Sequence, residues 1–231
     1  MAKRARRSAE TPSPATPVAP AGEPRDRIID AMMRLAAAND FRDIGLADIA
    51  AEAEVPLSTV RRNFDGKLGI LAAFSRRVDE QVLDKGAAEG EGARDRLFEV
   101  LMRRFEALVP YRDALRRIIR SARRDLRLAR SLHRIAKRSQ MWMLVAADIH
   151  KGGLVGRLAV EGAVLAYSDV LSVFLDDDDD LARTMARLDR SLRRGERAME
   201  WLDGICAFIP SFGGRLHDRS HRSGGGEEAM L

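Results

Sequence analysis

The chain has 231 residues, of which 45% are hydrophobic and 32% are charged, a composition typical of globular proteins rather than of disordered or fibrous chains. Its formal net charge of +5 favours polyanionic partners. Its single cysteine excludes an internal disulfide and predicts a reducing, cytoplasmic location. No apolar run is long enough for a membrane span, so the sequence predicts no transmembrane helix.

Both ends of the chain differ in composition from its middle. Residues 1–24 are rich in Ala, Pro, Ser and Thr and carry a cluster of lysine and arginine near the start. Such a segment has little to bury, so we predict a disordered basic arm, which either follows nucleic acid or is a solvated tail. Residues 211–231 include a Ser-Gly-Gly-Gly stretch and are predicted to be a disordered tail.

The first regular element is predicted over residues 25–39. Ile28, Ile29, Met32 and Leu35 recur with helical spacing and form one apolar face. The turn-prone pair Asn-Asp follows. This pattern predicts an amphipathic helix whose apolar face packs against neighbouring helices.

Two short helices joined by a tight turn are predicted next. Apolar residues stand at i, i+3, i+4 and i+7 from Leu46 to Ala53, and Glu54, Val55 and Pro56 then interrupt the pattern. Because proline fixes its own φ and lacks an N–H, it suits the first turn of a new helix. The second short helix is therefore predicted over residues 56–63.

The outer face of this second helix carries small and hydrogen-bonding side chains, while Val60 and Phe64 are expected to face inward. A longer helix is predicted from Lys67 to Leu83. Side chains that can approach phosphates and base edges in a major groove are Ser58, Thr59, Arg61, Arg62, Asn63 and, at the start of the longer helix, Lys67. Residues 25–84 are thus predicted to form a helix-turn-helix domain.

With these elements in place, residues 25–83 resemble the N-terminal domain of TetR-family transcriptional regulators. The resemblance is carried by residues 28–37, Asp48, Ile49, Ala50, Ala53, Val55, Thr59, Phe64, Lys67, Ile70 and Leu71. It implies that the second short helix enters the major groove while the start of the Lys67 helix touches the DNA backbone. The chain departs from the family pattern at Glu54, where glycine is usual, at Pro56, where a small cap is usual, and at Arg61, which replaces an aromatic residue.

Residues 92–210 are predicted to be helical and to form a second domain. One amphipathic helix ends near Pro110, and a long helical region runs over residues 112–150 with a break near residues 122–126. Beside its apolar stripe lies a row of arginines, here called the arginine ridge: Arg116, Arg120, Arg123, Arg127, Arg130 and Arg134. The arginine ridge is either a solvated face or a surface for an anionic partner.

Two further helices complete the predicted second domain. An apolar helix is expected over residues 155–175, and the acidic run 176–180 is interpreted as a helix-start signal rather than a metal site. From Leu181 onward, apolar residues alternate in steps of four and three, which is a heptad seam. The resemblance implies a homodimer built on these two helices, and an internal core is the alternative. The predicted interface residues are Val164, Leu171, Leu181, Met185, Leu188, Leu192, Met199 and Leu202.

The resemblance also implies a cavity for a small effector in the second domain. Its predicted walls are Phe105, Leu108, Tyr111, Met141, Trp142, Val145, Tyr167, Leu171 and Phe174. Large apolar side chains at helical spacing also form plain hydrophobic core, so both interpretations stand. An apolar or amphipathic effector is expected.

These features together predict an all-α protein of about nine helices. The TetR resemblance implies the function of a sequence-specific regulator, a ligand-responsive repressor that binds a palindrome in double-stranded DNA as a homodimer. The C-terminal half also faintly resembles lipid-binding proteins of ubiquinone biosynthesis, whose fold is TetR-like. That resemblance is carried by Trp142, Ala147, Asp148, Tyr167, the acidic run, Thr184, Leu188, Asp189 and Arg190. It implies an alternative, a helical lipid or isoprenoid-binding protein that does not read DNA.

No pattern in the sequence indicates an enzyme, a cofactor or a metal site. A zinc site needs three or four converging ligands, and His133, His150, His217 and His221 do not form such a set. The chain has no glycine-rich phosphate loop and no Gly-x-Ser-x-Gly turn. We therefore expect neither catalysis nor a bound cofactor or metal.

Overall fold

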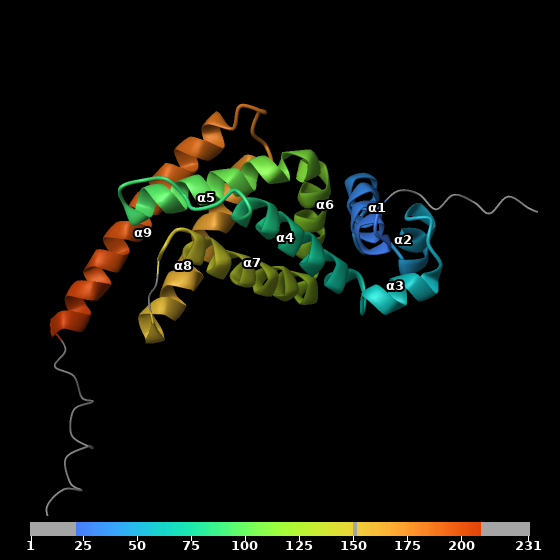
Figure 1. Cartoon of the computed structure of the whole chain (residues 1–231), viewed down its shortest axis with the longest axis horizontal. Coiled ribbons are helices and arrows are strands. Elements are labelled where there is room, and N and C mark those ends of the chain that lie inside the picture. Colours follow the sequence, from blue (N-terminus) through green and yellow to red (C-terminus); the bar gives the residue numbers. More distant parts are fainter. Residues whose placement is uncertain (1–21, 150–151, 209–231) are drawn as a thin grey trace, which may run out of the picture.

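The computed structural model describes residues 22–149 and 152–208, with side chains described as far as residue 197. Within these ranges the chain forms nine α-helices, one short 3-10 helix and no strand (Figure 1). The all-α class predicted from the sequence is confirmed. Most of the predicted arm and the whole predicted tail lie outside the described residues.

Three helices form a small head at one end of the molecule (Figure 1). They are α1 (Pro24–Ala38), α2 (Leu46–Glu52) and α3 (Leu57–Asn63). Pro24 stands at the first helical position of α1, where its missing N–H costs no hydrogen bond. The three helices share one core, whose larger buried side chains include Ile28, Ile29, Met32, Ile49 and Val60.

The turn between α2 and α3 holds Glu54 in the left-handed region, with φ of 51°. This is the position at which the family pattern has glycine, and a non-glycine residue in this region is strained. The prediction that Pro56 occupies the first turn of the next helix was wrong. Pro56 has an extended backbone with ψ of 145° and acts as the N-cap, so helical geometry begins at Leu57. Its carbonyl still accepts the N–H of Thr59 at 2.8 Å.

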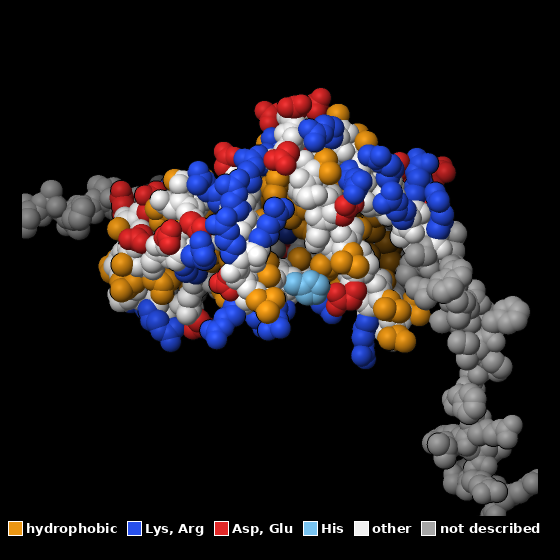
Figure 2. Space-filling view, turned by 180° about the vertical axis from the view of Figure 1, so that it is seen from behind, with side chains coloured by type: hydrophobic (Ala, Val, Ile, Leu, Met, Phe, Trp, Pro, Cys, Tyr) orange, Lys and Arg blue, Asp and Glu red, His pale blue; other side chains and the backbone are white. Residues whose placement is uncertain are grey.

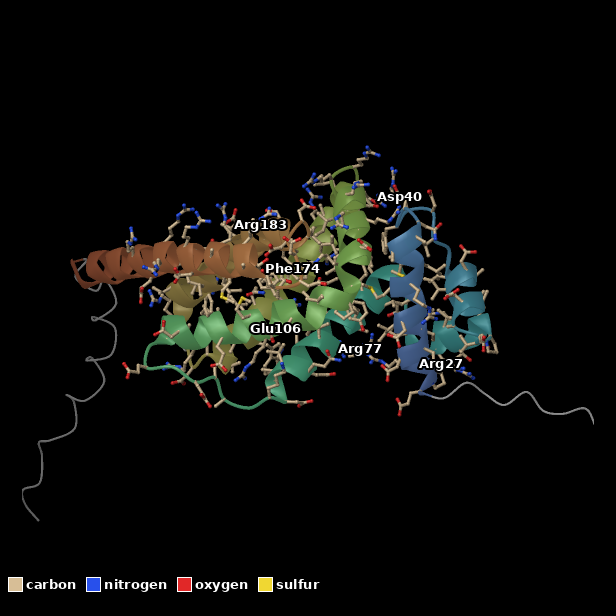
Figure 3. All side chains as sticks on the ribbon, turned by 90° about the horizontal axis from the view of Figure 1, so that it is seen from above. Arg27, Asp40, Arg77, Glu106, Phe174 and Arg183 are labelled. Atoms are coloured by element: carbon tan, nitrogen blue, oxygen red, sulfur yellow. The ribbon has the colours of Figure 1, made fainter. Side chains whose placement is uncertain are left out.

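Helix α4 (Lys67–Leu83) leads from the head into the body of the molecule (Figure 1). It begins at the predicted lysine, directly after Gly66, whose φ of 156° falls in a region that favours glycine. Arg77 of α4 pairs with Asp30 of α1 at 2.5 Å, and Figure 3 shows Arg77 beside α1. Helix α4 therefore contacts the head through an ion pair and also packs in the body.

The first half of the body consists of α5 (Ala93–Leu108), a 3-10 turn (Val109–Tyr111), α6 (Arg112–Ala122) and α7 (Leu126–Ala146). The predicted break in the long helical region is confirmed between α6 and α7. Asp125 forms it by capping α7, because its side chain accepts two backbone N–H groups of the first turn at 2.8 and 3.1 Å.

Helices α8 (Gly153–Phe174) and α9 (Ala182–Phe208) pack against each other and complete the body. The acidic run before α9 provides caps, which supports its interpretation as a helix-start signal. Asp180 accepts the N–H of the first residue of α9 at 3.0 Å, and Asp177 accepts both the N–H and the hydroxyl of Thr184 at 2.6 Å.

Aromatic rings form the centre of the body. The ring of Phe105 lies 5.2 Å from that of Tyr167 and 5.2 Å from that of Phe174. Figure 3 shows Phe174 among the helices of the body. No helix in the described part of the chain is long and apolar enough to cross a membrane.

Candidate nucleic-acid interface and effector cavity

Helix α3 has a buried apolar side and an exposed polar side, as predicted. Val60 is 1% and Phe64 8% exposed, whereas Ser58 and Arg61 lie on the surface. Arg61 pairs with Asp65 at 2.8 Å, but its side chain is 75% exposed. Because such surface pairs are weak, the guanidinium can exchange this carboxylate for a phosphate.

Thr59 lies on the buried side of α3 and is only 8% exposed. Its hydroxyl accepts a hydrogen bond from Arg62 at 2.9 Å, and its carbonyl accepts one from the side chain of Asn63 at 2.8 Å. The expectation that Thr59 itself reaches DNA is not supported by this placement, because it adjoins Val60 on the inner face. Thr59 instead orients two exposed polar side chains.

Lys67 is directed toward the protein's own backbone. Its Nζ donates to the carbonyls of Phe41 at 2.8 Å and Arg42 at 3.3 Å, and it stands 4.9 Å from the centre of the Phe41 ring. Burial lowers the pKa of Lys67, and Asp43 and Asp40 partly oppose that shift. Lys67 therefore fastens the α1–α2 connection to α4, which leaves at most one N–H of its ammonium for a DNA phosphate.

One exposed residue of α3 was missed by the sequence reasoning. Leu57, the first residue of the helix, is 53% exposed. The N-terminal residues of a recognition helix contact base edges, and an apolar side chain there suits the methyl group of thymine. The helical spacing of apolar residues did not indicate an exposed Leu57, because an apolar residue three positions before Val60 is expected on the buried side of the helix.

A cavity of about 600 Å³ lies in the body among α4, α5, α6, α7 and α8. This volume falls within the range of about 300 to 1,000 Å³ that is usual for small-molecule sites. Of the predicted wall residues, Leu108, Tyr167 and Leu171 line the cavity. Phe105 and Phe174 do not, because both are fully buried in the aromatic core.

The other predicted wall residues lie elsewhere. Tyr111 packs edge-on against Phe74, with ring centres 4.8 Å apart, and Phe74 itself lines the cavity. Met141, Trp142 and Val145 are 47%, 48% and 45% exposed, because helix periodicity turns them to the outer side of α7. Trp142 borders a second hollow of about 860 Å³ between α4 and α7.

A large part of the cavity wall comes from α6, which the sequence reasoning did not assign to it, and from residues of α7 other than the predicted ones. Leu115, Ile118 and Ile119 of α6 line the cavity, and so do Ala129 and Ala136 of α7. The sequence indicated the apolar stripe of residues 112–150, but it did not indicate that a cavity lies against this stripe. The signal that could have located the cavity is the small size of the two alanines, which leave space where larger side chains would close the core.

A buried polar network reaches the cavity wall from α4. Arg104, 4% exposed, donates to Asp79 at 3.1 Å, Ser139 at 3.0 Å, Tyr167 at 2.6 Å and Ser75 at 3.2 Å. Burial raises the pKa of Asp79, which the charge of Arg104 partly opposes. Ser75, Arg104 and Tyr167 line the cavity, and the network connects it to four helices, namely α4, α5, α7 and α8.

The predicted dimer residues lie mostly inside the protomer. Val164, Leu181, Leu188 and Leu192 are 2%, 4%, 0% and 8% exposed, so their side chains are already covered within one protomer and this part of the interface prediction was wrong. Within the residues whose side chains are described, the seam is internal except at Met185, which favours the alternative of an internal core. Met185 is exposed and Leu171 lines the cavity. The side chains of Met199 and Leu202 lie outside the described residues.

Helix α8 instead exposes an apolar face that the sequence reasoning missed. Leu154, Leu158 and Leu165 are 71%, 45% and 69% exposed. Their spacing of four and seven residues places them on one side of the helix. Three exposed leucines therefore lie on the outward side of α8, together with the partly exposed Glu161, while its inward side supplies core residues.

The fold is shared with solved regulators. A TetR transcriptional regulator from Nitrosomonas europaea ATCC 19718 is 24% identical, with a TM-score of 0.59 over 76% of this chain and 99% of that chain. A TetR transcriptional regulator from Rhodococcus sp. RHA1 is 20% identical, with a TM-score of 0.54 over 74% of this chain and 95% of that chain. Neither a protein-family model nor a curated protein matches the sequence. The chain therefore has the fold of the TetR transcriptional regulators.

Proposed function

We propose that the protein is a sequence-specific DNA-binding regulator, and that it represses transcription until a small effector binds its cavity. The observation that carries this proposal is the two-sided α3, which buries Val60, is followed by the buried Phe64, and presents Ser58, Arg61 and Asn63 to solvent. A helix of this kind at the surface of a helix-turn-helix head suits a major groove. The shared fold of solved regulators supports the same function.

The proposed regulator acts as a homodimer through α8. One α3 reads few base pairs, whereas two related by a twofold axis read a palindrome. The exposed leucines at positions 154, 158 and 165 form an apolar face of the kind that subunit interfaces cover. The proposed dimer interface is therefore the side of α8 that carries these leucines, in place of the heptad seam.

The effector is proposed to act through α6. This helix supplies part of the cavity wall and packs against α1 of the head. A ligand that moves α6 would therefore change the position of α3 relative to its counterpart in the dimer. The lining supports a small apolar or amphipathic effector.

DNA binding is tested by selecting sequences from a random duplex pool with the full chain. We expect a palindromic consensus, and we expect Arg61→Gln to weaken binding to it about tenfold, the loss of roughly one side-chain contact. Arg193→Gln is the matched control, because Arg193 is also exposed and pairs with a carboxylate four residues away, but on α9. No enrichment of any sequence would refute DNA reading and favour the lipid-binding alternative.

The dimer is tested by light scattering on the full chain. Leu165→Glu is expected to convert dimer to monomer, because it places a charge in the proposed apolar interface. Leu126→Glu is the control, since Leu126 is 65% exposed but lies at the start of α7. A monomer for the wild-type chain at micromolar concentration would contradict the proposal.

A further inference from the structure

The structure divides the arginine ridge into parts with different surroundings. Arg116, Arg120 and Arg123 line the cavity of about 600 Å³, whereas Arg127 and Arg130 are exposed and do not. Figure 2 shows one face of the molecule, on which lysine and arginine side chains lie beside apolar ones. A part of the ridge thus borders a largely apolar cavity instead of forming a purely solvated face.

Two of these three arginines have side chains without a partner in the described part of the chain. Arg116 bonds to the carbonyl of Leu175 and to Asp113, and it lies 3.5 Å from Asp176. The side chains of Arg120 and Arg123, in contrast, form no hydrogen bond or ion pair with any residue that the structure describes. They are three residues apart at the end of α6, a spacing that brings side chains together on one helix face.

Each of the other ionisable side chains at the cavity has a partner within the protein. Arg104 is satisfied by its buried network, and Asp176 faces Arg116. His133 lies 3.3 Å from Glu161, a carboxylate that Lys137 also contacts. The charge left over at the cavity is therefore positive, and it belongs to Arg120 and Arg123.

We infer that the cavity takes an amphipathic anion, a molecule with one terminal acid group and an apolar chain. Arg120 and Arg123 hold the acid group by charge-assisted hydrogen bonds, as guanidinium groups hold carboxylates and phosphates. The apolar chain lies along the side chains of Leu115, Ile119 and Leu132, which line the same cavity. This inference rests on the proposed function, since it defines the chemistry of the effector in the same cavity.

Calorimetry on the full chain without DNA tests this inference. The probes are decanoate, decyl phosphate, decan-1-ol and decyltrimethylammonium, which share one chain and differ in head group. We expect both anions to bind about tenfold or more tightly than the alcohol, and the cation to bind least. A preference for decanoate or for decyl phosphate then identifies the acid group as carboxylate or phosphate. Equal binding of acid and alcohol, or no binding of any probe, would overturn the inference.

Variants locate the acid group within the cavity. Arg120→Gln with Arg123→Gln should remove most of the preference for the anions and leave the affinity for decan-1-ol unchanged. Arg117→Gln with Arg124→Gln is the matched control, because both residues are exposed at the same end of α6 and neither lines the cavity. Equal losses in the two double variants would refute a local site and show a general charge effect.

Charge reversal provides a second readout that does not depend on loss of binding. Arg120→Glu with Arg123→Glu is expected to invert the preference, so that decyltrimethylammonium binds more tightly than decanoate. Calorimetry on the wild-type chain tests this inference, and DNA selection tests the proposed function, so a negative result in one does not decide the other. Anion binding without DNA enrichment would refute the proposed function alone, whereas DNA enrichment without anion binding would refute this inference alone.

Discussion

The hydroxyl of Ser121 donates a hydrogen bond of 2.9 Å to the carboxylate of Asp40. Ser121 lies near the end of α6, and Asp40 lies in the connection between α1 and α2, where Figure 3 shows it beside α6. The same carboxylate accepts the backbone N–H of Arg42 at 2.9 Å. The helix that lines the cavity is therefore bonded directly to the head.

This relationship predicts a pH dependence of stability. Hydrogen bonds from Arg42, and then from Ser121, hold the pKa of Asp40 well below its ordinary range. A depressed folded-state pKa adds stability above the unfolded pKa of about 3.9, and this is lost as the pH falls toward the folded value. The free energy of unfolding should therefore differ between wild type and Asp40→Asn at pH 7, and the difference should shrink below about pH 4.

Chemical denaturation at several pH values measures this difference. Ser121→Ala is the companion variant, because it leaves the hydrogen bonds from Arg42 in place and should retain most of the dependence. A difference between wild type and Asp40→Asn that is constant from pH 7 to pH 3 would contradict the assignment.

The turn before α3 predicts a stabilising substitution. Glu54 has φ of 51°, a region that costs a non-glycine residue about 1 kcal/mol or more. Glu54→Gly removes this cost, and Glu54→Ala removes only the charge. We expect the glycine variant to exceed the alanine variant by about 1 kcal/mol in free energy of unfolding, measured by denaturation at pH 7. Equal stability would show that the turn is unstrained.

Periodicity explains why the fold could be predicted from the sequence. The spacing from Leu46 to Ala53 is a local signal, and it placed α2 correctly. The break predicted near residues 122–126 also matches the α6–α7 connection, although its cap at Asp125 was not predicted. The start of α3 was missed by one residue because proline serves equally well as a cap and in a first turn. Element type was thus predictable, while its boundary depended on one backbone angle.

The candidate site was less predictable, because apolar patterns do not state what covers a residue. Leu188 and Leu165 both belong to helical apolar patterns, yet one is fully buried and the other is 69% exposed. Thr59 and Lys67 are of types that bind DNA, but their partners are within the protein. The packing of helices that are distant in sequence decides whether such residues are buried and what they contact. The spacing of residues along one helix does not contain this information.

Lys67 predicts an effect on stability that does not require DNA. Its Nζ bonds to the carbonyls of Phe41 and Arg42, so Lys67→Met should lower the free energy of unfolding by about 1 to 2 kcal/mol. Lys85→Met is the control, because Lys85 is half-exposed and its nearest carboxylate oxygen, on Glu106, is 3.9 Å away. Thermal unfolding of the free protein compares them. Equal melting temperatures would assign Lys67 to DNA contact alone.

The buried pair of Asp79 and Arg104 predicts strongly non-additive variants. Asp79→Asn leaves a buried guanidinium without its counter-charge, and Arg104→Met leaves a buried carboxylate, so each should cost about 3 to 5 kcal/mol. The double variant removes both charges and should cost clearly less than the two single changes together. Denaturation of the three variants forms the cycle. Additive losses would show that the two charges act independently.

Gln140 predicts that a polar side chain can be replaced with a gain in stability. Its side chain on α7 is fully buried, and neither its amide nitrogen nor its amide oxygen has a hydrogen-bond partner among the described residues. An unsatisfied buried amide costs about 1 to 3 kcal/mol, whereas methionine has a similar length and no such requirement. Gln140→Met should therefore raise the free energy of unfolding by about 1 kcal/mol or more. Gln140→Glu is the opposite control, because a buried charge should lower stability, and thermal unfolding would rank the three proteins.

A methionine variant less stable than wild type would mean that the amide has a partner in solution, which would make this position a polar site within the body.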